Sequence, residues 1–208
     1  MAARNPILLA LLAVPLVAQT PSPPVLPVEA KPITVAPGAS VRLKYHFLAV
    51  GKQIYKCENG AWSKGSTPDA TLYDMNSHLK VHHGAGPSWA MVDGSGSLKA
   101  IGPTAIHFAS PDGVSIDWLK LDVDKASRTG DFSDVGIIQR LYTGAGKAPA
   151  AGCAANEIYE SAYTAHYYFW VLKVTGALHI PVKPLDGQVA RDCVRPSRNR
   201  CRSGRCPE

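Results

Sequence analysis

The stretch Val41–Ala49 (VRLKYHFLA) decides the class of fold of this chain. Its apolar residues fall at every second position, and the polar side chains of Arg42, Lys44 and His46 stand between them. A period of two is typical of a β-strand that buries one face and exposes the other. The fold should therefore be built from strands.

The same alternation recurs along the chain, and turn-forming residues separate the segments. Residues 154–162 (AANEIYESA) could instead form one or two helical turns. Many short strands broken by Gly and Pro predict an all-β domain, a single antiparallel sandwich or barrel with Gly- and Pro-rich loops. The further strands are expected at Gln53–Cys57, Thr71–Asp74, Leu79–His83, 116–123, 135–141 and Tyr163–Leu172, with turns at Gly51, Asn59–Gly60, Asn76–Ser77 and Asp93–Gly96.

The chain has 208 residues, of which 46% are hydrophobic, and this size and composition suit one domain, expected over residues 40–175. Residues 1–18 have a basic start at Arg4 and a short apolar run, Ile7–Val17, before Ala18. Such a run is too short to span a bilayer and is typical of a cleaved secretory signal. We therefore expect a secreted or periplasmic protein without stable membrane insertion. Residues 19–39 are rich in Pro and should form an extended linker.

Residues 176–208 form a basic, Cys-containing tail that carries most of the formal net charge of +6. It has no aromatic side chain to stack on bases, so we favour a solvated, disordered tail over an arm that binds nucleic acid. The spacing of Cys193, Cys201 and Cys206 does not match a structural zinc site, and their pairing stays open.

Several kinds of chemistry find no support. The glycines at Gly94–Gly96 and Gly144–Gly146 lack the third Gly and the following helix of a nicotinamide-binding turn. His78, His82 and His83 lack metal-protease spacing, no nucleophile elbow occurs, and most Asp residues stand in turns. We expect no cofactor, no metal site and no nicotinamide-dependent dehydrogenase activity.

Seven motifs in a fixed order resemble the secreted bacterial and fungal family known as domain of unknown function 3455, over about residues 40–170. The resemblance implies an extracytoplasmic protein and carries no established activity. Members often have an acid where this chain has Ala90 and an Asp where it has His166. The motifs are Gln53–Cys57, Ala70–Asp74, His83–Trp89, Ile116–Leu119, Ile138–Arg140 and Gly146–Pro149 with Gly152–Cys153, followed by Tyr163–Phe169.

Two cysteines, Cys57 and Cys153, each end one of these motifs. In an exported protein two such thiols more often pair than react, so we predict a Cys57–Cys153 disulfide.

A binding site is expected on two loops. In His83–Trp89, Gly84, Gly86 and Pro87 could set an imidazole beside an indole, with Asp93 close enough to orient the imidazole. In the other loop Lys147 is the single charged side chain, and Gln139 and Arg140 lead into it. The alternative is that both loops are tight connections and that Trp89 plugs the end of the sheet.

Export, a strand-rich pattern and no recognisable catalytic group favour a ligand-binding or interaction module. A hydrolase acting on an extracellular polymer, through acids and His83, is the second hypothesis. A structural protein of the cell envelope is the third. The sequence names neither a ligand nor an oligomeric state.

Overall fold

The computed structural model describes residues 21–172, so the expected signal at 1–18 and the tail at 176–208 lie outside the described residues. Antiparallel strands dominate, as the sequence predicts, and within residues 21–172 no helix is long and apolar enough to cross a membrane. The strands are β1 (Val41–Glu58), β2 (Ala61–Trp62), β3 (Thr67–Tyr73), β4 (Leu79–Gly84), β5 (Ser88–Met91), β6 (Ser97–Lys99), β7 (Ile106–Phe108), β8 (Trp118–Asp122), β9 (Val135–Ala145) and β10 (Ile158–Leu172).

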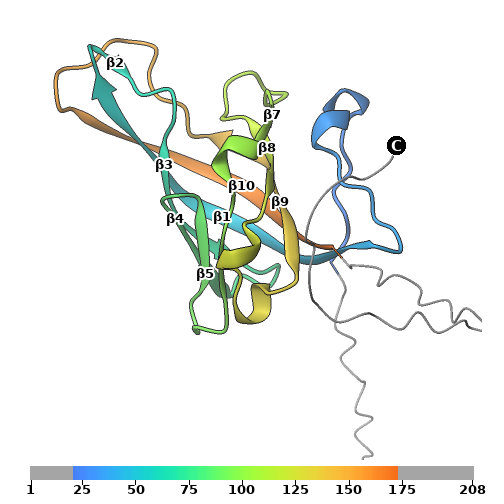
Figure 1. The fold of residues 1–208 in the computed structure, drawn as a ribbon. Helices are drawn as coiled ribbons and strands as arrows, with labels where there is room; N and C mark the ends of the chain where they lie inside the picture. Colours follow the sequence, from blue (N-terminus) through green and yellow to red (C-terminus); the bar gives the residue numbers. More distant parts are fainter. Residues whose placement is uncertain (1–20, 173–208) are drawn as a thin grey trace, which may run out of the picture. The chain divides into compact units, whose positions relative to one another are not determined.

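All the strands belong to one sheet in the order β6-β5-β4-β3-β1-β10-β9-β8-β7, with β2 paired to the end of β1. The two longest strands, β1 and β10, lie side by side at its centre (Figure 1). Short 3-10 helices occur at η1 (Val28–Ile33), η2 (Gly102–Thr104), η3 (Lys125–Ser127) and η4 (Gly130–Phe132).

Strand β1 runs through Gly51 without a break, whereas the sequence pattern predicts two strands separated there. A Cβ atom at Gly51 would lie 2.3 Å from Asp69 O and 2.4 Å from Ala70 Cβ. Glycine is therefore needed because β3 approaches the backbone of β1 closely, and not because the chain turns.

The sheet curls into a half-barrel because its two ends meet over part of their length. Ala100, just after β6, bridges Val123, just after β8, and Ile101 N donates to Asp122 O at 2.9 Å. The concave face of the sheet holds the larger core. Its fully buried side chains include Leu72, Val81, Trp89, Leu98, Phe132, Ile138, Tyr167 and Phe169.

The convex face is covered by the Pro-rich segment that the sequence suggested as a linker. Ala30 and Ile33 of η1 are completely buried there, in a second core with Trp118, Leu141 and Trp170. Figure 1 shows this segment beside β7, β8 and β9. An extended Pro-rich segment leaves backbone carbonyl groups without partners in the segment itself, and side chains of the sheet supply donors to two of them. Gln139 Nε2 donates to Ile33 O at 2.6 Å, and the Tyr142 hydroxyl donates to Val25 O at 2.6 Å.

The stretch 154–162 differs from the suggested helical turns. Asn156 adopts a positive φ of 66° in a turn, and Ile158–Ala162 begin β10 by pairing with Lys52–Lys56 of β1. Pairing with the long central strand satisfies backbone groups that a short helix would leave unpaired. Beside this turn, Cys57 and Cys153 form the predicted disulfide, with their Cα atoms 5.7 Å apart.

Candidate functional site

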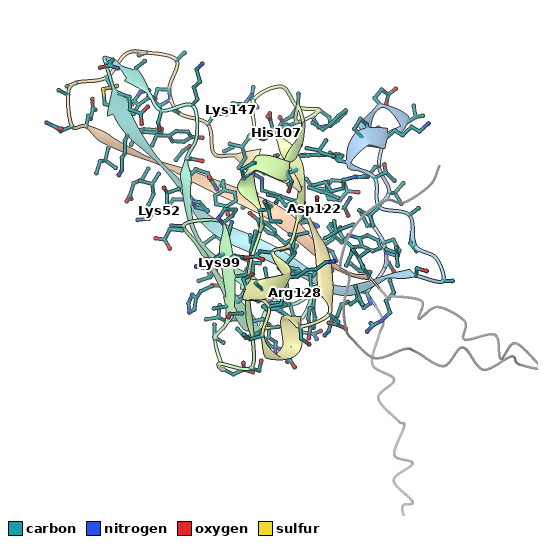
Figure 2. All side chains as sticks on the ribbon, viewed as in Figure 1. Lys52, Lys99, His107, Asp122, Arg128 and Lys147 are labelled. Carbon is teal, nitrogen blue, oxygen red and sulfur yellow. A yellow bond between two sulfur atoms is a disulfide. The ribbon has the colours of Figure 1, made fainter. Side chains whose placement is uncertain are left out.

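A pocket of about 570 Å³ opens on the concave face of the sheet; we call it the concave pocket. The β4–β5 hairpin, the start of β3, strand β8 with the residues just before it, and the middle of β9 contribute to its lining. Lys147 and His107, which both line it, lie at the same end of the domain, whereas Arg128 lies at the other end (Figure 2). The lining side chains that matter below are Gln53, Tyr55, Lys64, Ser66, His83, Trp89, Ala105, His107, Ile116, Asp117, Leu119, Leu121, Arg140, Lys147 and Tyr167.

Four of the six residues suggested for binding, His83, Trp89, Arg140 and Lys147, line this pocket together. Gln139 does not. It is adjacent to Arg140 in β9, and successive side chains of a strand point to opposite faces, so Gln139 enters the convex core.

Asp93 does not line the concave pocket either. It is exposed in the β5–β6 turn, where its Oδ1 accepts from Ser95 N at 2.9 Å. It therefore does not orient His83, because the His83 Nδ1 atom is 2.9 Å from the backbone oxygen of Ser88 instead.

His83 is buried and neutral. A carbonyl oxygen can only accept, so Nδ1 carries the proton and donates to Ser88 O, which leaves Nε2 as an acceptor. The imidazole stacks on the Trp89 indole with ring centroids 4.3 Å apart. Burial is the main cause that lowers the pKa of His83 to about 4; the hydrogen bond to Ser88 O acts in the opposite direction, and the positive charge of Arg140 adds a smaller lowering. At neutral pH this ring is consequently an uncharged part of the pocket wall.

Arg140 is half-buried, and its guanidinium is held by a backbone group. Nη2 and Nε donate to Asp117 O at 2.8 Å and 3.2 Å. Among residues 21–172, no carboxylate lies within ion-pair distance of Arg140. The Asp117 carboxylate contacts His107 instead, with Oδ2 3.2 Å from Nδ1.

Gln53 belongs to the pocket but was not singled out from the sequence. It is 1% exposed, its Oε1 accepts from Ser66 Oγ, and its Nε2 has no hydrogen-bond partner among the described residues. The indole Nε1 of Trp89 is likewise buried without a partner. The sequence pattern contained a signal for Gln53. Its position in β1 continues the alternation of the buried residues Phe47 and Ala49, so it is a polar side chain at a position where the pattern predicts burial.

Tyr55 and Lys147 are held in place at the mouth of the pocket. The Tyr55 hydroxyl donates to Gly146 O at 2.7 Å, and Lys147 Nζ donates to Gly113 O at 3.0 Å. Lys64 adds a second exposed amine to the lining. The mouth therefore carries two ammonium groups.

The acids that a hydrolase would need are elsewhere. Asp74 is in the β3–β4 turn, where it accepts from the backbone N–H groups of Asn76 and His78. Neither Asp74 nor Asp93 lines the concave pocket, and Asp117 is the one carboxylate among the described residues that does. Ala90 and His166, where the chain departs from the family pattern, also lie outside it.

No group of three or more His, Cys, Asp or Glu side chains that could hold a metal ion occurs within residues 21–172. Two imidazoles, those of His46 and His166, do lie close together, with Nε2 and Nδ1 3.0 Å apart, and both rings lie outside the concave pocket.

Comparison with known proteins supports the resemblance read from the motifs. Neither the curated proteins nor the solved structures contain a match to this chain. One family model, described as Protein of unknown function (DUF3455), matches residues 37–171, which is more than half of the chain and includes every residue of the concave pocket named above. The chain therefore belongs to the DUF3455 family.

Proposed function

We propose that the domain is a ligand-binding module and that the concave pocket is its binding site. The observation that carries this proposal is the buried amide of Gln53, whose Nε2 has no partner among the described residues. A buried donor without a partner costs about 1–3 kcal/mol, and a ligand that accepts from it would recover this cost. The indole N–H of Trp89 supports the same conclusion.

The size and lining of the pocket also fit a small molecule. Ligand sites commonly enclose about 300–1,000 Å³ and combine apolar walls with a few polar groups. Here Trp89, Leu119 and Leu121 supply apolar surface, and Gln53 and Arg140 supply donors.

The lining favours binding over acid–base catalysis. Its one carboxylate, Asp117, contacts His107, and burial keeps the pKa of His83 well below neutral pH. A general base works best when its pKa is near the working pH, so His83 does not suit that role.

We also propose that the protein acts outside the cytoplasm. Disulfides persist in secreted and periplasmic compartments and are rare in the cytosol. The Cys57–Cys153 bond and the signal-like residues 1–18 agree with export.

The chain offers a direct test, because its four Trp indole N–H groups each give a separate NMR signal. The exported protein would be titrated with benzamide, benzylamine and benzoate, which share one ring and differ in charge. Binding in the concave pocket should shift the Trp89 indole signal and leave those of Trp118 and Trp170, in the convex core, unchanged.

Ala105→Phe would place a bulky ring in the lining of the pocket and should abolish the shift, whereas Ala126→Phe, on exposed η3, should not. If none of the three compounds moves the Trp89 signal, or if Ala105→Phe binds as the parent does, the proposal fails.

A further inference from the structure

We infer that the concave pocket selects organic anions, with the guanidinium of Arg140 binding the carboxylate, sulfonate or phosphate group of a ligand that has a flat apolar body. This inference rests on the proposed binding function and names the class of ligand.

The first support is the charge of the lining. Lys64, Arg140 and Lys147 contribute three positive charges, against one negative charge from Asp117. The carboxylate of Asp117 contacts His107 and makes no ion pair with Arg140, which has no anionic partner within residues 21–172. A ligand that brings a negative charge would supply the missing partner.

The second support is the position of Arg140. Charged side chains are seldom withdrawn from water without a partner, because removing a charge from water is costly. Arg140 is half-buried among groups that are uncharged at neutral pH, which include His83, Tyr55 and Tyr167. Burial is the largest influence on these groups: it lowers the pKa of His83 and raises the pKa of Tyr55 and Tyr167. The positive charge of Arg140 acts on all three as well, and it lowers the pKa of each.

The third support is preorganisation. The two bonds to Asp117 O fix the guanidinium before any ligand arrives. Arginine has five N–H donors in a planar fork, so donors remain for an oxyanion. Gln53 Nε2 and Trp89 Nε1 are further unpaired donors in the same lining. Side chains that surround one cavity and carry donors without an acceptor favour a ligand rich in acceptor atoms.

The apolar part of the lining determines the rest of the ligand. Trp89, Ile116, Leu119 and Leu121 supply an apolar wall area within the lining. Such a wall gains by covering an apolar body, at roughly 25 cal/mol for each Å² removed from water. An inorganic ion would leave this wall wet, so the expected ligand is an organic acid and not free phosphate or sulfate.

Two dyes with one aromatic skeleton test the inference. 8-Anilino-1-naphthalenesulfonate carries a sulfonate, and N-phenyl-1-naphthylamine lacks it. Fluorescence titration of the exported chain should show the sulfonate binding about tenfold or more tightly than the neutral dye, since a hydrogen bond to a charged group contributes about 1.5–3 kcal/mol.

Arg140→Gln should remove most of this preference while leaving the affinity for the neutral dye within about twofold. Arg140→Lys keeps the charge and loses the planar fork, so an intermediate preference is expected. Arg128→Gln is the matched control: Arg128 is also half-buried and also donates to a backbone carbonyl, Val135 O at 2.8 Å, but it does not line the pocket. It should leave both affinities unchanged.

The outcomes separate the two proposals. If both dyes bind the parent chain equally, or if Arg140→Gln weakens both alike, anion selection is refuted and the binding function stands. If neither dye binds and the benzene compounds leave the Trp89 signal unmoved, the binding function itself fails. Should Arg140→Gln not fold, Lys147→Gln and a salt titration of the parent replace it, because screening by salt weakens the sulfonate alone. Equal salt responses of the two dyes would then refute the inference.

Discussion

His83 and Trp89 stack face to face across neighbouring strands, with ring planes 2° from parallel and centroids 4.3 Å apart. The pair forms one wall of the concave pocket. Because the imidazole is buried in this stack and uncharged, the stability of the domain should depend on pH.

The pKa of His83 is about 4 in the folded chain and about 6.5 in the unfolded chain. Below pH 6.5 the unfolded chain therefore binds a proton that the folded chain does not. The contribution of His83 to the free energy of unfolding is fully present above pH 6.5. It is lost as the pH falls to about 4, and the loss amounts to about 3 kcal/mol. His46, whose pKa burial and the neighbouring His166 lower to about 4, acts in the same direction.

Urea unfolding between pH 7 and pH 4 measures this loss. In the His83→Gln variant the free energy of unfolding should depend less steeply on pH. The imidazole proton signals of His83 should not titrate until about pH 4. A His83 titration near pH 6.5 would contradict the buried stack.

Gln139 and Arg140 are neighbours in β9, but substitutions at the two positions should affect different properties: stability at Gln139 and dye binding at Arg140. Gln139 joins the convex core by accepting from Trp170 Nε1 at 2.6 Å and donating to Ile33 O. Gln139→Leu leaves both groups buried and unpaired, so the free energy of unfolding should fall by roughly 2–5 kcal/mol. The affinity for either dye should not change. A Gln139→Leu variant with parental stability and weaker dye binding would place this side chain in the pocket after all.

Ile33 tests whether the Pro-rich segment is part of the domain. Its side chain is completely buried in the convex core, so Ile33→Ala should cost about 2–5 kcal/mol of unfolding free energy. Val28, in the same 3-10 helix, is 81% exposed, and Val28→Ala should change stability by less than about 0.5 kcal/mol. Equal effects of the two substitutions would mean that the segment does not pack on the sheet.

The Cys57–Cys153 disulfide closes a loop with a sequence separation of 96. On the chain-entropy model a loop of this length contributes about 4–5 kcal/mol, so Cys57→Ser should lower the unfolding free energy by about that amount. The double variant with Cys153→Ser should be no less stable than either single variant. Peptide mapping without reduction checks the pairing, and recovery of Cys57 joined to Cys193, Cys201 or Cys206 would refute it.

The local pattern was enough to predict much of this domain. Alternation in Val41–Ala49 indicates a strand, and the turn residues at Asn76–Ser77 and Asp93–Gly96 mark hairpins that the structure contains. These features depend on residues close in sequence, where side-chain alternation and turn propensity act directly. The ordered motifs were likewise sufficient to identify the family.

The sequence could suggest candidates for the site but not which of them face it. A strand pattern shows that Gln139 and Arg140 point to opposite faces, yet it does not show which face is concave. That choice depends on the curl of the sheet, which closes through contacts between residues such as Ala100 and Val123. For the same reason Asp93, only four residues after Trp89, lies outside the pocket, whereas Gln53 lies inside it.

By itself, then, the sequence determined a β-rich domain, its family and the two cysteines that pair, because each leaves a signal in local order or spacing. Only the tertiary structure decided that Gly51 is a point of close approach and that the Pro-rich segment covers the convex face. It also brought His83, Arg140 and Lys147 to one cavity. The physical reason is that these features depend on the packing of segments far apart in the chain, and that packing minimises exposed apolar surface and unpaired backbone groups over the whole fold.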